Sequence, residues 1–222
     1  MVPATGDEED TMTAAIAPFP EERRIPMTYD EWLEWAEGPR MSEWVDGEAI
    51  EFMPPTERHQ DVVLFLAMLL RALVELRGLG SVIAAPFEVR IRSRGSREPD
   101  VIFVAQHRRH LLDGKRLNGA PDLAIEVISD DSVRRDRITK RDEYAAARVP
   151  EYWIVDCRPG HEREEFLLLD EGGRYREADL DERGRFHSAV LPGFWLDPAW
   201  LRADPMPSAF ACLKEIAPDA FA

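Results

Sequence analysis

The sequence predicts a mixed α/β (α+β) fold in which a central mixed β-sheet is flanked by helices. Residues 59–78 hold the longest helical pattern of the chain, with Val62, Leu66 and Leu73 on one broad apolar face. Residues 121–156 give a strand, a turn, a charged helix and a second strand within 36 residues. Helices and strands that follow each other so closely are typical of a sheet covered by helices.

Length and composition indicate one domain with short extensions. A chain of 222 residues with 45% apolar residues can bury a full core. We expect a disordered acidic leader at residues 1–24, a single domain at residues 25–205 and a C-terminal tail at residues 206–222. The first 22 residues contain six acids and no base, which is the wrong charge for a secretory or mitochondrial leader.

Apolar runs and cysteines indicate a cytoplasmic protein without a membrane span. The longest apolar run, residues 62–70, stops at Arg71 after nine residues, whereas a helix needs roughly 20 to cross a bilayer. The two cysteines, Cys157 and Cys212, are too few for a disulfide framework or a cysteine zinc site. We therefore expect both thiols to be reduced.

The charge is strongly negative but unevenly spread. A net charge of −15 argues against a large basic surface for nonspecific nucleic-acid binding. Residues 90–97 nevertheless hold four arginines, and residues 134–141 hold four arginines and a lysine. Such patches are either solvated, ion-paired surface or, beside an acidic site, a place where phosphates bind.

Local signals place the elements of the first half of the chain. A capping box of Thr28 and Glu31 begins a short helix that ends near Glu37. Asp46-Gly47 is a two-residue hairpin signal between strand-like segments of residues 43–53. The further predicted elements are strands at 81–85, 87–92 and 101–105, with a turn at 94–97 and a polar connection at 106–119.

The second half contains a strand at residues 123–128 that Glu126 interrupts. The cluster of residues 129–132 has helix-capping chemistry and precedes a helix at residues 133–147, which Val149-Pro150 ends. A strand at residues 151–156 follows. Beyond it we expect a meander of short strands near 166–169, 175, 186 and 189–191, closed by residues 192–196 lying across the core.

Two carboxylates stand at equivalent places on neighbouring apolar segments. Asp100 lies at the start of one predicted strand and Glu126 within the next. Carboxylates brought together across adjacent strands repel each other unless a cation lies between them, which is how a hard oxygen site for Mg²⁺ or Mn²⁺ is commonly built. Such an ion can lower the pKa of water and neutralise a phosphate.

A lysine is the expected third member of this set. Position 128, which shares a strand face with Glu126, is Ile, so the lysine must come from elsewhere. At helical spacing Lys140 falls on a stripe that faces the sheet, and it is one of only three lysines beside 25 arginines. A lysine can activate water through a lowered pKa. The alternative is that Lys140 merely pairs with Asp136 at i−4.

The order of these motifs resembles the Uma family of restriction-endonuclease-like proteins, within the PD-(D/E)XK nuclease superfamily. The resemblance covers roughly residues 28–201. It rests on Glu-Pro-Asp100, on Pro-Asp-x-x-x-Glu126-Val-x-Ser, on Lys140 with Tyr144, and on Val-Pro-Glu-Tyr-Trp-x-Val-Asp156. The hairpin at Asp46-Gly47, the histidine at position 59 and the Leu-Pro-Gly-Phe segment extend it.

The resemblance implies an αβββαβ-type core and a divalent metal, Mg²⁺ or Mn²⁺, held by Asp100 and Glu126. In that family the motif lysine has typically moved to the next helix, which matches Lys140. Glu43 resembles the additional acid that many of these nucleases bring to the metal. His59 occupies a recurrent family position, where it either orients water or phosphate or is a satisfied, half-buried histidine.

Other polar residues of the stretch receive structural interpretations. Asp122 shares a strand face with Glu126 but lies four residues away, about 13 Å, so both can hardly bind one ion. Asp130, Asp131 and Asp136 are interpreted as capping and helix-start charges. Tyr144 is expected to serve core packing.

Three hypotheses follow for function. The first is a metal-dependent endonuclease that hydrolyses DNA phosphodiester bonds, with a homodimer as a compatible assembly because two twofold-related sites can cut both strands. The second is a catalytically silent nuclease-fold protein that binds or assembles, which the acidic net charge favours. The third makes Asp100, Glu126 and Lys140 a buried, stabilising ion-pair cluster.

Overall fold

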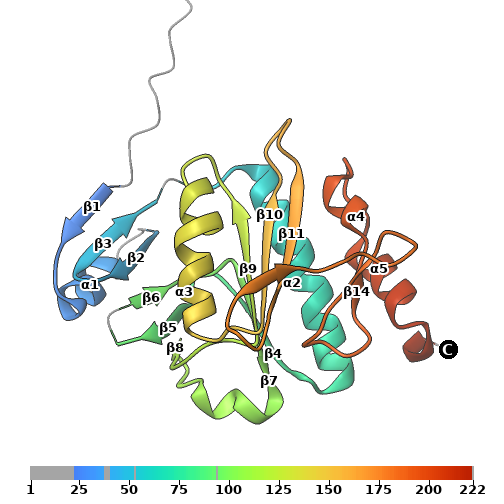
Figure 1. The fold of residues 1–222 in the computed structure, drawn as a ribbon, viewed down its shortest axis with the longest axis horizontal. Coiled ribbons are helices and arrows are strands. Elements are labelled where there is room, and N and C mark those ends of the chain that lie inside the picture. Colours follow the sequence, from blue (N-terminus) through green and yellow to red (C-terminus); the bar gives the residue numbers. More distant parts are fainter. Residues whose placement is uncertain (1–22, 38–40, 53, 94, 222) are drawn as a thin grey trace, which may run out of the picture.

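Two six-stranded sheets and a two-stranded sheet organise the part of the chain that the structure describes. The computed structural model describes residues 23–37, 41–52, 54–93 and 95–221. Figure 1 shows α2 and α3 beside the strands of the sheet that contains β9 and β10. It shows β1, β2, β3 and α1 at one end of the molecule and α4 and α5 at the other. The predicted leader lies outside the described residues, except that Arg23 and Arg24 belong to β1.

The central sheet is mixed, as predicted. β9 and β10 are parallel in register, with Glu126 opposite Ile154, and every other pair of neighbours in this sheet is antiparallel. In spatial order its strands are β12 (Tyr175–Glu177), β11 (Arg163–Leu169), β10 (Glu151–Asp156), β9 (Leu123–Ile128), β7 (Val101–Ala105) and β4 (Gly80–Ala84).

The second sheet contains the predicted hairpin. Asp46 and Gly47 both have positive φ, 53° and 97°, the conformation that a tight two-residue turn between twisted strands requires. In spatial order the strands are β1 (Arg23–Pro26), β3 (Glu48–Glu51), β2 (Ser42–Val45), β6 (Gly95–Arg97), β5 (Glu88–Arg92) and β8 (Arg116–Leu117). Beside them, α1 (Tyr29–Ala36) begins with the predicted Thr28 capping box.

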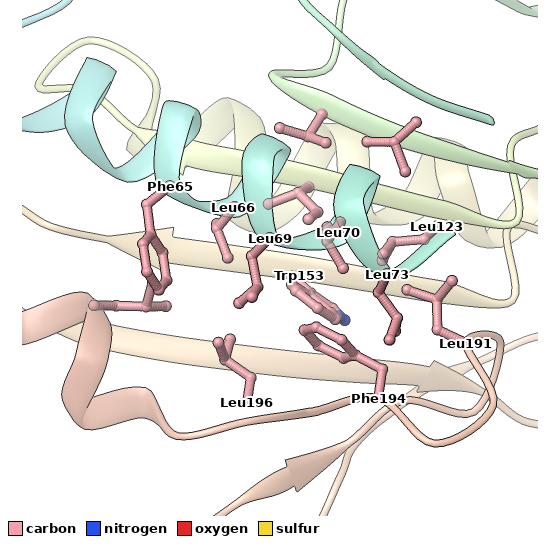
Figure 2. Close-up of a cluster of buried hydrophobic side chains, with 14 of the residues drawn as sticks. Phe65, Leu66, Leu69, Leu70, Leu73, Leu123, Trp153, Leu191, Phe194 and Leu196 are labelled. Carbon is pink, nitrogen blue, oxygen red and sulfur yellow. The ribbon is translucent and has the colours of Figure 1, made fainter. Parts of the chain in front are cut away.

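Helix α2 (Glu57–Arg77) covers one face of the central sheet. Thr56 caps its first turn, and Gly78 ends it in the left-handed conformation. Alternate residues of β9 and β10, such as Ile125 and Trp153, face this helix. Figure 2 shows its leucines, together with Phe194 and Leu196 from the C-terminal segment, around the Trp153 ring.

The C-terminal segment closes that core. β13 (Phe186–His187) pairs with β14 (Trp195–Leu196), and α4 (Pro198–Arg202) follows. Residues 206–222, predicted as a tail, instead form α5 (Ala209–Ile216), whose Leu213 and Ile216 are buried in the α2 core, and the turn η3 (Pro218–Phe221). Their short apolar pattern was too weak to mark a helix by itself.

The other face of the central sheet packs against the segment predicted as one helix at residues 133–147. It consists of a π-helical turn, η2 (Arg135–Lys140), followed by α3 (Arg141–Ala146). Tyr144 packs edge to face on Tyr152 of β10, with ring centroids 5.0 Å apart. The π-helical turn changes which side chains face the sheet, because each of its residues advances less around the axis than in an α-helix.

Two loop predictions differ from the structure. Residues 94–97, predicted as a turn, contribute β6 at Gly95–Arg97, because these residues pair with both β2 and β5. The connection at 106–119 contains the 3₁₀ helix η1 (Gln106–Leu111) and β8, while 189–191 form bends and no strand.

None of the described helices combines the length and hydropathy needed to cross a lipid bilayer. Both cysteines are free and buried.

Candidate active site

The pairing of β7 with β9 brings the two predicted carboxylates together. In this antiparallel pair Val101 lies opposite Ile125, and Asp100 and Glu126 are the residues next to these two at the same end of the pair. Asp100 Oδ2 accepts a hydrogen bond of 2.7 Å from the backbone N–H of Val127, which fixes the carboxylate against β9. Burial raises the pKa of Asp100 although His59 and this hydrogen bond oppose the shift.

A cavity of about 70 Å³ lies between the two sheets at this point, which is room for several water molecules. Its wall combines carboxylates with cations and a few apolar groups. The charged and titratable lining residues are Glu43, His59, Glu98, Asp100, Glu126, Arg135, Asp136 and Lys140. All five residues predicted for the site therefore line one cavity.

Lys140 points inward, as predicted, from the last position of the π-helical turn. Its Nζ lies 2.8 Å from Glu126 Oε2, 3.1 Å from Glu43 Oε1 and 3.4 Å from Asp136 Oδ1. Burial opposes its charge, but the three carboxylates outweigh burial and raise the pKa of Lys140 above its ordinary value. Lys140 is therefore held in its charged form, without the lowered pKa through which a lysine can activate water.

The hairpin strand β2 delivers Glu43, which is 1% exposed. Glu43 Oε2 accepts a hydrogen bond of 2.7 Å from Arg97, and Oε1 accepts one of 3.0 Å from the backbone N–H of Glu98. Burial disfavours the charge of Glu43, but Lys140 and Arg97 lower its pKa to about 2. Glu48 and Glu51, the neighbouring acids, instead pair with Arg24 and Arg23.

Helix α2 places His59 in its first turn, where the side chain is buried beside Asp100. The distance between His59 Nε2 and Asp100 Oδ2 is 3.6 Å, an ion-pair distance that is too long for a hydrogen bond. Among the described residues, His59 Nδ1 has no hydrogen-bond partner. The structure therefore brings His59 to the site but does not satisfy its ring.

The side chain of Glu126, on β9, is held by contacts from η2 and α3. Tyr144 donates a hydrogen bond of 2.7 Å to Glu126 Oε1, so Tyr144 contacts the site as well as the core. Burial, with Asp136 and Asp100 nearby, outweighs the effect of Lys140 and raises the pKa of Glu126 to about 8.

Three further charged residues line the cavity, although the sequence did not place them at the site. Asp136, interpreted as a helix-start charge, is 1% exposed and lines the cavity, and among the described residues its Oδ1 has no hydrogen-bond partner. Burial and Glu43 raise the pKa of Glu98 to about 7. Arg135 lines the wall beside them. The signal for Asp136 and Arg135 was their place in the charged run 134–141.

The remaining acids of the stretch lie outside the cavity. Asp122 accepts hydrogen bonds of 2.7 Å from the backbone N–H of Ala105 and 2.9 Å from Arg108, which agrees with its structural interpretation. Asp131 accepts a hydrogen bond from Ser129, and Asp130 lies 3.5 Å from Arg158. These three carboxylates stabilise loops around the sheet.

The donor chemistry of the cavity fits a hard divalent cation. Mg²⁺ and Mn²⁺ prefer oxygen ligands, and Mg²⁺ commonly uses one or two carboxylates with water completing its shell. Asp100 and Glu126 are such a pair, and the Asp136 carboxylate, whose Oδ1 lies 3.4 Å from Lys140 Nζ, adds negative potential. Within the described ranges, no three His, Cys, Asp or Glu side chains form an assembled metal cage.

Comparison with known proteins identifies the fold and the family of the chain. A crystal structure from Anabaena variabilis, described as "a putative nuclease belonging to DUF820", is similar to the chain with a TM-score of 0.63 at 17% identity. The similarity covers 80% of this chain and 98% of that one, and it establishes the shared fold. No curated protein sequence matches. The model of the Uma2 family, described as "Putative restriction endonuclease", matches residues 28–199, so the resemblance is confirmed and the chain belongs to the Uma2 family.

Proposed function

We propose that the protein is a metal-dependent endonuclease that hydrolyses DNA phosphodiester bonds. The observation that carries the proposal is one cavity lined by Asp100 and Glu126, in which Lys140 contacts Glu126 at 2.8 Å. Membership of a family described as "Putative restriction endonuclease" supports the nucleic-acid substrate.

The residues of the cavity have distinct roles in this proposal. Asp100 and Glu126 hold Mg²⁺ or Mn²⁺, which supplies Lewis-acid polarisation of phosphate and a lower pKa for water. Lys140, being a permanent cation, donates a hydrogen bond to the attacking water or to a phosphate oxygen and does not act as a base. Glu43 fixes the Lys140 ammonium, and His59 packs beside the Asp100 carboxylate.

The test is cleavage of supercoiled, linear duplex and single-stranded DNA in Mg²⁺ or Mn²⁺. We expect wild type to cleave at least one form, EDTA to stop it, and Glu126→Gln or Lys140→Met to lower the rate at least about 100-fold. Glu177→Gln, which changes a carboxylate that is 57% exposed and is not among the cavity-lining residues, is the matched control with wild-type activity. No cleavage by wild type, or equal rates in all variants, contradicts the proposal.

The second candidate is a nuclease-fold protein that binds without cutting. It is favoured by the enclosure of Lys140 within three carboxylates and by the net charge of −15. Calorimetric titration with Mn²⁺ separates the two candidates. The endonuclease binds Mn²⁺ in a manner that Asp100→Asn abolishes, whereas a silent relative shows no such binding. Light scattering of the same samples tests the proposed homodimer, which would offer one site to each strand of a duplex.

A further inference from the structure

Lys140 is surrounded by carboxylates from three separate segments of the chain. Its Nζ lies close to one oxygen of each, at 2.8 Å on β9, 3.1 Å on β2 and 3.4 Å on η2. These carboxylates belong to Glu126, Glu43 and Asp136. A lysine ammonium has three hydrogens and accepts no hydrogen bond, so three carboxylates match its donors. Because the side chain is only 4% exposed, Lys140 is an internal cation of the site.

The position of this ammonium is next to the proposed metal ion. Glu126 is one of the two carboxylates proposed to hold the ion, and its Oε2 contacts Lys140. A carboxylate has two oxygens with about four lone-pair sites, so it can contact two cations at once. In enzymes that use two metal ions for phosphate chemistry, the ions lie about 3.5–4 Å apart. A second ion would therefore need the place that the ammonium occupies.

The carboxylates around the ammonium are already bound to other donors. Glu43 Oε2 accepts a hydrogen bond of 2.7 Å from Arg97, and Oε1 accepts one of 3.0 Å from the backbone N–H of Glu98. Asp100 differs from them. Among the described residues it is not an ion-pair partner of Lys140, and its side chain, 18% exposed, is more accessible than the three that contact the ammonium. Asp100 is therefore the carboxylate that remains open to an ion.

We propose that the Lys140 ammonium takes the place of a second metal ion, so that the site holds a single divalent cation on Asp100 and Glu126. The proposal rests on the proposed function and sets the number of metal ions within it. A second divalent ion would be repelled by the ammonium and would have to share its carboxylates. Glu43 then holds the ammonium and is not a metal ligand. The contact with Asp136 is the longest of the three, and it is the one that a water or phosphate oxygen can replace during cleavage.

The experiment counts the Mn²⁺ ions that each chain binds. Calorimetric titration gives the stoichiometry, and EPR spectroscopy separates a spin-coupled pair of adjacent ions from isolated ions and from ions on the acidic surface. We expect wild type to bind one isolated Mn²⁺. Lys140→Met removes the ammonium and frees the three carboxylates, so the stoichiometry should rise from one to two, with a spin-coupled pair. Lys115→Met, which changes an exposed lysine outside the cavity lining, is the matched control and should bind one ion.

Further variants separate metal binding from folding. If Lys140→Met does not fold, Lys140→Gln replaces it, because the amide keeps a hydrogen-bond donor without the charge, and two ions are again expected. Adding Asp136→Asn to either variant removes one carboxylate of the vacated position, so the stoichiometry should return to one. The melting temperature of the Lys140 variants should rise more with Mn²⁺ than that of wild type, because the second ion replaces the lost cation.

The outcomes distinguish this inference from the proposed function. A wild type that binds no Mn²⁺ and cleaves no DNA contradicts the proposed function, and the inference with it. A wild type that binds a spin-coupled pair of Mn²⁺ ions overturns the role of Lys140 and leaves the nuclease proposal intact. A folded Lys140 variant that binds only one ion has the same meaning, because an ammonium that merely stabilises the interior can be removed without opening a metal position.

Discussion

Glu126 carries opposing influences on one carboxylate. Its Oε1 accepts a hydrogen bond from the Tyr144 hydroxyl, and its Oε2 contacts the Lys140 ammonium. Both contacts favour the charged form of Glu126. Burial and the carboxylates of Asp136 and Asp100 disfavour that form, and they raise the pKa of Glu126 from 4.5 to about 8. Without a bound cation, Glu126 therefore keeps its proton to a higher pH than an exposed glutamate does.

This raised pKa makes folding stability depend on pH in a predictable direction. Between about pH 4.5 and pH 8 the folded protein keeps a proton on Glu126 that the unfolded chain has lost. Stability from this group is therefore present at low pH and falls as pH rises through that window, by up to about 1.4 kcal/mol per unit. Glu126→Gln cannot titrate, so the wild type should lose several kcal/mol relative to this variant between pH 5 and pH 8.

Urea unfolding of both proteins in metal-free buffer measures the difference. Glu98, whose pKa is raised to about 7, titrates in both proteins and so largely cancels. A difference in the free energy of unfolding that stays constant with pH would show that Glu126 is ionised throughout.

At the scale of single residues, the sequence predicted which side chains form the site but not their protonation states. Asp100 and Glu126 followed from the strand pattern, since equivalent positions on neighbouring strands meet. The sequence did not show that the pKa of Lys140 is raised, because its three carboxylate neighbours come from three separate segments. Asp136 lies in the first turn of η2, as its interpretation as a helix-start charge requires, and it also lines the cavity beside Lys140, its partner at i+4.

At the scale of elements, buried ion pairs connect the hairpin to the helix that carries Lys140. Arg97 of β6 is 1% exposed and lies 2.7 Å from both Glu43 of β2 and Glu143 of α3. Glu143 also pairs with Arg92 of β5. The predicted turn at 94–97 missed this connection, because a three-residue strand with two charged or polar side chains has no apolar pattern to mark it.

Loss of Arg97 should therefore destabilise the protein strongly. Arg97→Met leaves Glu43 buried with one cation fewer, and removing one partner of a buried ion pair typically costs about 3–5 kcal/mol. Arg92→Met makes the same substitution at an arginine that is 39% exposed and also pairs with Glu143, and exposed pairs contribute roughly 0–1 kcal/mol. Chemical denaturation of the two variants checks the prediction. Equal losses would mean that Arg97 does not anchor Glu43.

At the scale of the whole molecule, one apolar core joins distant parts of the chain. The α2 leucines, alternate residues of β9 and β10, and the segment from Leu191 to Ala217 enclose it (Figure 2). The sequence predicted α2, β9 and β10 because their patterns are long and periodic. It could not predict that residues after 205 complete the core, because eight-residue α5 has too few turns to display a clear period and gains its stability from packing on α2.

The contribution of α5 can be measured with a single substitution. Leu213 is 5% exposed and packs in the α2 core, so Leu213→Ala should lower the free energy of unfolding by about 2–5 kcal/mol through lost contacts and the cavity left behind. Leu180→Ala removes the same atoms from a side chain that is 47% exposed and should change stability by less than about 0.5 kcal/mol. Urea denaturation of both variants gives the comparison. If residues 206–222 were an independent tail, Leu213→Ala would be as harmless as Leu180→Ala, whereas a large, selective loss shows that the folding unit extends through α5.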